Sequence, residues 1–185
     1  METSGWIAIA IAAIVLVLIV VAIAVVRRRR HSNWLRDQFG GEYDRVMDTS
    51  DKRRDAERDL DDRIDLRENV ELRELSPASR DRYLGEWRDI QGRFVDRPET
   101  AVDEVDALVA QVMRERGYPV DDFETRAGLV SVDHPQLVED YRHAHDVALR
   151  NRQRSAETEE LREALLRYRS LFDALLGTRS SSHEA

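Results

Sequence analysis

The sequence predicts an all-α protein in which an N-terminal transmembrane helix is followed by a charged stalk helix and a small bundle of about four to five helices. Three observations carry this prediction. An unbroken apolar stretch covers residues 6–26, four arginines follow it at 27–30, and the second half of the chain repeats apolar residues at helical spacing. No stretch shows the turn-punctuated alternation of β-branched and polar residues that is typical of a sheet.

The apolar stretch has the length of a membrane span. Its 21 residues carry no charge, no proline and no strongly polar side chain. As a helix they would extend about 31 Å, and the hydrocarbon core of a bilayer is about 30 Å thick. We therefore expect residues 6–26 to bind the lipid bilayer. The alternative is a cleaved signal peptide, for which Ala22-Ile23-Ala24 offers a cleavage pattern, but the chain lacks the basic n-region and the short apolar core.

Charge on the two flanks of the span predicts its orientation. Residues 1–5 carry no Lys or Arg, whereas the basic juxtamembrane segment 27–41 begins with four arginines. Basic flanks stay in the cytoplasm, so we expect a short extracytoplasmic N-terminus and a cytoplasmic C-terminal body on the plasma membrane. The residues predicted to set the membrane interface and the topology are Trp6, Arg27, Arg28, Arg29, Arg30 and Trp34.

Beyond the arginines the chain is acidic and contains no cysteine. Residues 31–185 hold 25 of the 29 basic and 36 of the 37 acidic residues, a net charge of about −11. Such a body repels nucleic acid, so no nucleic-acid partner is expected. The absence of cysteine excludes disulfides, thiolate chemistry and Cys-ligated zinc.

The most highly charged part of the chain, residues 42–69, is predicted to form a solvated stalk helix. Its apolar line consists of Ala56, Leu60 and Ile64 alone, which is thin for a helix that packs in a core. Disorder, and a coiled coil with a second copy, remain as alternatives. As a single helix the stalk would hold the body about 40 Å from the membrane. Residues 70–76 are predicted to be an extended connector that docks on the domain beyond.

Residues 77–177 are predicted to form the all-α bundle, followed by a disordered tail at 178–185. Ser76-Pro77 supplies an N-cap and a first helical position, and Gly117 and Gly177 stand where helices end. Helices are expected over about 77–95, 96–117, from a capping box at Asp121, from 133–135, and over 158–176. The residues expected to face the core are Tyr83, Trp87, Ile90, Phe94, Val102, Val105, Val109, Val112, Met113, Phe123, Ala127, Leu137, Val138, Tyr141, His145, Ala148, Leu149, Leu161, Leu165, Tyr168, Phe172 and Leu175.

Several segments resemble a group of small actinobacterial proteins that have one N-terminal span, an arginine cluster and a helical cytoplasmic body. The segments that carry the resemblance are FGGEYDR (39–45), LSPASRDRY (75–83), RFVDRP (93–98), VMRERGYPVDDFE (112–124) and SVDHPQLVEDYRHAH (131–145). The resemblance covers nearly the whole chain. It implies a fold and a topology, and it assigns no functional residues.

No pattern predicts a catalytic residue, a cofactor site or a metal site. The nearest candidate, Asp140-x-x-His143, is a single copy with Asp in place of Glu, whereas di-iron bundles use two Glu-x-x-His motifs and two further Glu. His143 is expected at the surface, His145 at the core boundary, and His134 beside Pro135 near a helix start. The glycines are scattered and form no phosphate-binding loop.

These observations favour a membrane-anchored interaction or scaffold module that binds a protein partner or a second copy of itself. Two alternatives remain open. One is a membrane-associated enzyme that uses carboxylates with His143 or His145 as acid and base, and the other is a structural homo-oligomer joined through a coiled-coil stalk. A buried, strongly shifted carboxylate–His pair in a pocket would favour the enzyme.

Overall fold

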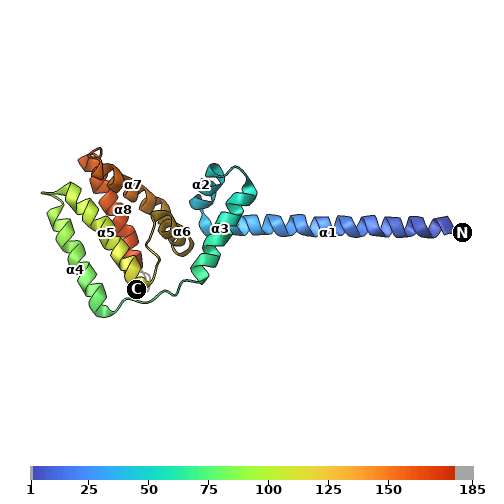
Figure 1. Ribbon diagram of the computed structural model, residues 1–185, viewed down its shortest axis with the longest axis horizontal. Coiled ribbons are helices and arrows are strands. Elements are labelled where there is room, and N and C mark those ends of the chain that lie inside the picture. Colours follow the sequence, from blue (N-terminus) through green and yellow to red (C-terminus); the bar gives the residue numbers. More distant parts are fainter. Residues whose placement is uncertain (1, 178–185) are drawn as a thin grey trace, which may run out of the picture. The chain divides into compact units, whose positions relative to one another are not determined.

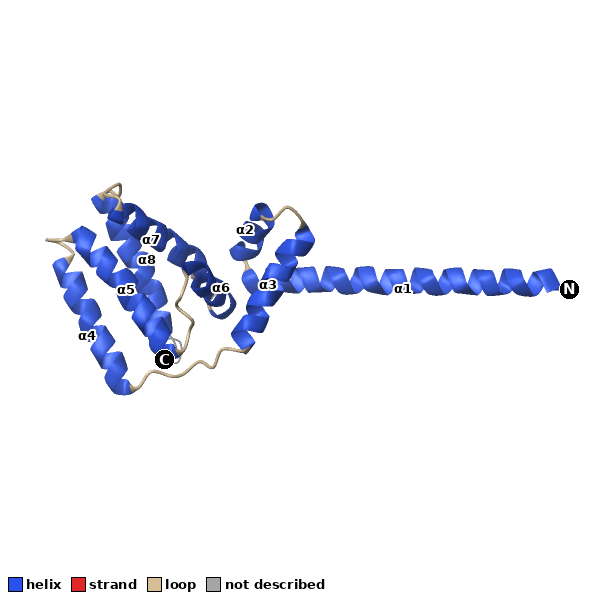
Figure 2. Cartoon of the chain, viewed as in Figure 1, coloured by secondary structure: helices blue, strands red, loops and turns tan. Residues whose placement is uncertain are grey.

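The computed structural model describes the backbone of residues 2–177 and the side chains of residues 15–177. Within these limits the chain forms eight helices and no strand, which confirms the predicted all-α class (Figure 2). The predicted tail, residues 178–185, lies outside the described residues. The chain divides into two compact units, residues 1–38 and residues 39–185, and each is considered by itself.

The first unit consists of most of one long helix, α1 (Glu2–Phe39), which is drawn in blue in Figure 1. It continues without a break from the apolar stretch through the arginines and ends before Gly40, where φ is +53°. The large apolar side chains over residues 15–26 are all between 47 % and 62 % exposed. Across the part of the chain that the structure describes, no helix combines the length and the apolarity needed to cross a membrane.

The second unit begins with two short helices, α2 (Gly41–Thr49) and α3 (Arg53–Glu68), so the predicted single stalk helix over 42–69 is wrong. The chain leaves the helical conformation between them, and Lys52 is extended. The two helices pack against each other, and α3 also packs against α6. Ala56 and Leu60 are fully buried within the chain, which leaves neither for a coiled coil with a second copy. The thin apolar line is buried where α3 packs against α2 and α6.

Between α3 and α4, residues 71–76 have no regular structure and dock on the bundle. The Arg73 N–H donates to the carbonyl of Arg116 at 2.8 Å, and Leu75 is buried. The connector passes close to Gly117, where φ is +96°. A Cβ at Gly117 would lie 2.7 Å from the carbonyl oxygen of Glu71, so both the conformation and the close approach require glycine.

Five helices form the bundle in the order that the sequence predicts. They are α4 (Pro77–Arg93), α5 (Pro98–Arg116), α6 (Phe123–Asp133), α7 (Val138–Arg152) and α8 (Thr158–Leu176). The Ser76 hydroxyl caps α4 by accepting the Ser79 N–H at 3.0 Å, as expected. Two boundaries differ from the prediction. Asp122, not Asp121, caps α6, and the residues 133–135 close α6 rather than open α7.

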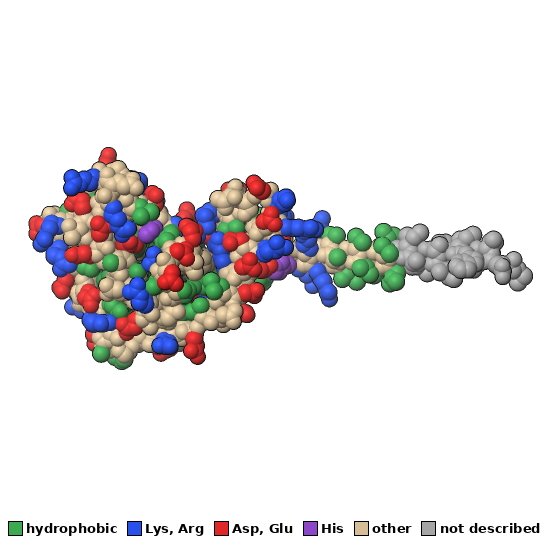
Figure 3. All heavy atoms as spheres, in the orientation of Figure 1, with side chains coloured by type: hydrophobic (Ala, Val, Ile, Leu, Met, Phe, Trp, Pro, Cys, Tyr) green, Lys and Arg blue, Asp and Glu red, His purple; other side chains and the backbone are tan. Residues whose placement is uncertain are grey.

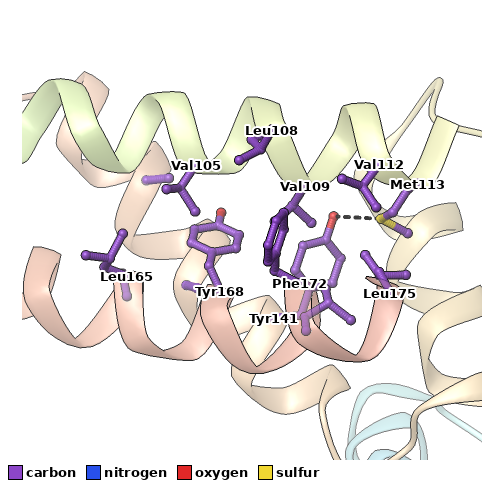
Figure 4. Packing of buried hydrophobic residues seen from close by; sticks show 14 of the residues in the cluster. Val105, Leu108, Val109, Val112, Met113, Tyr141, Leu165, Tyr168, Phe172 and Leu175 are labelled. Carbon is purple, nitrogen blue, oxygen red and sulfur yellow. Dashed lines mark hydrogen bonds between the residues drawn. The ribbon is translucent and has the colours of Figure 1, made fainter. Parts of the chain in front are cut away.

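The core lies where α4, α5, α7 and α8 meet. Figure 4 shows aromatic rings from α7 and α8 pointing toward the row of valines on α5. The ring of Trp87 on α4 lies 4.7 Å from that of Phe172 on α8, and the Tyr141 hydroxyl contacts the Met113 sulfur at 3.9 Å. The predicted core is confirmed with three exceptions: Leu149 is 42 % exposed, and Phe94 and Phe123 are only partly buried.

Candidate functional site

Three carboxylates in the second unit are buried or half-buried, and each accepts hydrogen bonds from several side chains. The first is Glu42 on α2, whose side chain is 1 % exposed. Arg45 binds both of its oxygens at 2.9 and 2.7 Å, Arg63 of α3 donates at 2.7 Å, and Arg142 of α7 donates at 3.1 Å. We call Glu42 with these three arginines the Glu42 node.

The arginines decide the charge state of Glu42. Burial by itself raises the pKa of a carboxyl group, but the hydrogen bonds from Arg45 and Arg63 and the charge of Arg142 outweigh it. The pKa of Glu42 is therefore lowered from 4.5 to about 2. At neutral pH the group is a carboxylate that accepts hydrogen bonds and takes up no proton, so it joins helices rather than acting as an acid or base.

The second carboxylate is Asp106 on α5, which joins α5 to α7 and α8. Its Oδ1 accepts the Tyr168 hydroxyl at 2.8 Å and lies 3.1 Å from His145 Nδ1, which donates because a carboxylate can only accept. Its Oδ2 accepts from Arg152 at 2.7 Å. Burial raises the pKa of Asp106, but these hydrogen bonds and the nearby charges lower it to about 2.

The Asp106–His145 pair is the arrangement that would favour an enzyme if it faced a cavity. The His145 ring stacks on Phe123 at 3.8 Å between centroids, with an interplanar angle of 8°, and the residue is 8 % exposed. Neither Asp106 nor His145 lines any of the four hollows described in the second unit. His145 thus lies at the boundary of the core with its ring hydrogen-bonded to Asp106, as its position in the helical pattern predicts.

The third carboxylate, Asp133 at the end of α6, binds α3 and the turn after α5. The Arg67 Nε donates to both of its oxygens at 2.7 Å, and the Tyr118 hydroxyl donates at 2.6 Å. Burial, together with the adjacent Asp133 charge, raises the pKa of Tyr118, so the phenol stays protonated and keeps donating. Asp133 and the Glu42 node together attach α3 to α6 and α7.

The hollows of the second unit are open and charged. One of about 700 Å³ lies between the start of α5 and the end of α7, and is lined by Glu99, Asp103, Arg152 and Arg154 among others. Arg152 is already bound to Asp103 at 3.2 Å and to Asp106. Two further hollows, of about 320 Å³ and 500 Å³, lie beside the Glu42 node.

The predicted interface residues are placed only in part. Arg27 through Arg30 are exposed on α1, directly after the exposed apolar residues (Figure 3). Trp34 is 49 % exposed, and its ring stacks on that of His31 with the centroids 6.0 Å apart. The side chain of Trp6 lies outside the described residues, as do those of residues 7–14.

The residues of the candidate metal motif take other roles. Asp140 forms an ion pair with Arg167 of α8, and His143 is exposed at the surface, as predicted. His134 follows α6 and accepts the Leu137 N–H at 2.9 Å through its carbonyl. Among the described residues, no three His, Asp or Glu side chains come together in a way that could hold a metal ion.

No local signal in the sequence predicts the Glu42 node. Glu42 lies in a stretch dense with acidic and basic residues, and two of its arginines are 21 and 100 residues away along the chain. Asp106 was missed for a similar reason. One signal was present, since Asp106 lies on the apolar side of α5 in line with Val102 and Val109, and an acid at such a position is expected to be buried and paired.

Over the described residues, these features define a class: an all-helical protein in which one helix exposes its apolar side chains and the other helices form a compact unit joined by ion pairs. Comparison with models of protein families gives no match, and neither do comparisons with curated proteins and with solved structures.

Proposed function

We propose that this protein is a single-pass membrane protein whose helical body faces the cytoplasm and binds a protein partner or a second copy. In this proposal residues 6–26 span the bilayer, and Arg27 through Arg30 keep the following residues inside.

One observation carries the proposal: every large apolar side chain of residues 15–26 of α1 is exposed, and Figure 3 shows those that lie on one face of the helix. A continuous apolar surface of this kind is rare on a protein surrounded by water. Four exposed arginines follow it at once, which is the charge pattern of a cytoplasmic boundary. The remaining residues of the span, 6–14, are apolar in the sequence.

The ion pairs of the body support binding rather than acid–base chemistry. The carboxylates with the most strongly lowered pKa, Glu42 and Asp106, are both held by arginines and remain ionised at neutral pH. Their partners come from different helices, so their role is to fix the relative positions of those helices. A body that is fixed in this way presents a constant, mixed-charge surface to a partner (Figure 3).

Membrane association is tested by placing charge in the exposed apolar surface. The double variant Leu18→Asp, Val21→Asp should move the full chain from the alkali-resistant membrane fraction to the soluble fraction, because an Asp near the bilayer centre costs about 2.5–3.5 kcal/mol. The matched control is Val95→Asp, since Val95 is an apolar residue of the body that is 86 % exposed. A double variant that stays in the membrane fraction, or a control that leaves it, would contradict the anchor.

Partner binding is tested by chemical cross-linking in native membranes. The chain contains only one lysine, so a reagent that joins carboxylates suits it. We expect cross-links from exposed acids of residues 41–177 to another protein or to a second copy. Cross-links confined to pairs within one chain would refute the interaction module while leaving the anchor intact.

A further inference from the structure

A group of positive charges follows the exposed apolar segment of α1, and the chain places no acid beside it in sequence. No Asp or Glu occurs from residue 3 to residue 36. Arg27 through Arg30 are all exposed, and within the described residues none of them forms an ion pair (Figure 3). In the second unit, by contrast, arginines such as Arg63 and Arg67 bind carboxylates. The four adjacent charges on α1 are therefore available to an anion from outside the chain.

Two of these arginines share one side of α1 with a stacked pair of rings. Four exposed residues at the spacing i, i+3, i+4 and i+7 lie on one side of this unbroken helix: Arg27, Arg30, His31 and Trp34. We call them the basic–aromatic face. The His31 and Trp34 rings have their centroids 6.0 Å apart and an interplanar angle of 24°. Arg28 and Arg29 lie off this face, because each residue turns the helix by about 100°.

The depth of the basic–aromatic face follows from the proposed anchor, in which Val26 is the last residue within the hydrocarbon. At about 1.5 Å per residue, Arg30 stands about 6 Å beyond Val26, and the headgroup layer on each side of a bilayer is about 5–8 Å thick. A long side chain on a helix covers the turn that precedes it. The ring of Trp34 accordingly lies against His31, one turn nearer the apolar segment. The arginines and the rings thus share the level of the lipid headgroups.

We propose that the basic–aromatic face binds the headgroup of a phospholipid of net negative charge in the cytoplasmic leaflet. This inference rests on the proposed membrane anchor. A phosphate between Arg27 and Arg30 would accept hydrogen bonds from both guanidinium groups, whose planar fork matches its oxygens. It would also relieve the repulsion between two like charges at i, i+3.

The rest of the lipid fits the same face. Aromatic rings at a membrane interface settle at the level of the headgroups, so the stacked rings of His31 and Trp34 would lie beside the glycerol of the bound lipid. A choline headgroup carries a fixed positive charge, which the four arginines repel. Lipids without that positive charge, such as phosphatidylglycerol, are therefore favoured.

The test is native mass spectrometry of the full chain in a neutral detergent, titrated with phosphatidylglycerol or with phosphatidylcholine. The mass of the intact complex counts the bound lipid molecules, and the titration gives the affinity for the first of them. We expect phosphatidylglycerol to bind at least about fivefold more tightly, which is the factor that one arginine contributes near an anionic lipid. Detergent micelles have no sidedness, so the orientation of the chain does not enter the result.

A matched pair of double variants separates the face from the total charge. Arg27→Gln, Arg30→Gln removes both arginines of the face, and we expect the preference for phosphatidylglycerol to fall about fivefold or more. Arg28→Gln, Arg29→Gln removes the same charge at the same mean depth, off the face, and should lower the preference by no more than about twofold. Equal losses would show that the arginines act only as diffuse charge, and would overturn the site.

Two further measurements test the rings and the source of the phosphate. Trp34→Ala should lose part of the preference, whereas Asn33→Ala, at the neighbouring exposed position off the face, should keep all of it. Inorganic phosphate added at constant ionic strength should leave the bound lipid in place. Loss of the lipid preference on addition of phosphate would assign the face to a soluble anion and overturn the proposal.

Failure of the site and failure of the anchor give different results. A chain that stays in the alkali-resistant membrane fraction but binds the two lipids equally overturns the headgroup site and leaves the anchor intact. A chain that is absent from the membrane fraction overturns both.

Discussion

Replacing Asp106 by Asn tests whether this buried carboxylate holds the bundle together. The variant keeps the shape of the side chain and removes the charge that Arg152, Tyr168 and His145 converge on. His145 and Arg152 belong to α7 and Tyr168 belongs to α8. Loss of the charge should therefore weaken the attachment of both helices to α5.

The pKa of Asp106 gives the size of the effect. Its fall from 3.8 to about 2 corresponds to about 2 kcal/mol of stability at neutral pH, since one pKa unit is worth about 1.36 kcal/mol. The pKa is lowered by folding, so this stability is complete above the unfolded pKa and is lost as pH falls through the folded pKa. About half of this stability should remain at pH 3.

The assay is thermal unfolding of the full chain in detergent, followed by near-ultraviolet circular dichroism. We expect Asp106→Asn to lower the midpoint by about 5–10 °C at neutral pH. The matched control is Asp103→Asn, one turn earlier on α5, which also contacts Arg152 but is 40 % exposed. It should cost no more than about 0.5 kcal/mol.

Two results would refute the reasoning. Equal destabilisation by the two variants would show that burial of Asp106 contributes nothing beyond an ordinary surface ion pair. A difference between wild type and Asp106→Asn that stays constant from neutral pH to pH 3 would show that the charge of the carboxylate is not the source of the stability.

Three further outcomes are expected. Trp87→Ala should cost about 3–5 kcal/mol in denaturant unfolding, whereas Trp34→Ala, at a half-exposed ring, should leave the midpoint unchanged. Gly117→Ala should destabilise by more than about 1 kcal/mol because of its φ and the close connector, whereas Gly92→Ala, with open space around it, should stabilise by about 0.5–1 kcal/mol. Replacing all of residues 27–30 by Gln should give mixed orientations of a C-terminal reporter in cells, and an unchanged single orientation would contradict their role as the topology signal.

The sequence was sufficient for the bundle because its helices are amphipathic. In α8 the apolar residues recur at helical spacing from Leu161 to Leu175, and the predicted limits of 158–176 are those of the structure. Gly117 and Gly177 end their helices in the left-handed conformation, as their positions predict. Periodicity and caps are local properties, and local properties can be recognised without the fold.

The stalk prediction failed because long-range ion pairs decide the structure of residues 42–69. In a stretch where most residues are charged, the sequence does not distinguish Glu42, which is buried among arginines, from an exposed neighbour such as Asp44. Arg142 belongs to a helix that begins far along the chain. Folding of this stretch onto the bundle also removes the predicted standoff of about 40 Å, which required one continuous helix.

Smaller errors came from residues that can serve two roles. Asp133-His134-Pro135 has the pattern of a helix start. In the structure Asp133 is instead the last residue of α6 and binds Arg67, and α7 begins at Val138. Leu149 follows the apolar side of α7 but lies near the end of that helix, where it is 42 % exposed. Packing at the ends of helices depends on the neighbouring elements, which periodicity does not describe.

The most direct test of the proposed anchor and its orientation is labelling of single cysteines in intact cells with a maleimide that does not cross membranes. The chain has no cysteine of its own, so each variant carries one thiol. Ser4→Cys, before the span, should be labelled from outside, and Gln153→Cys, at an exposed position after α7, should be labelled only after the membrane is permeabilised. Labelling of Gln153→Cys in intact cells would contradict the account.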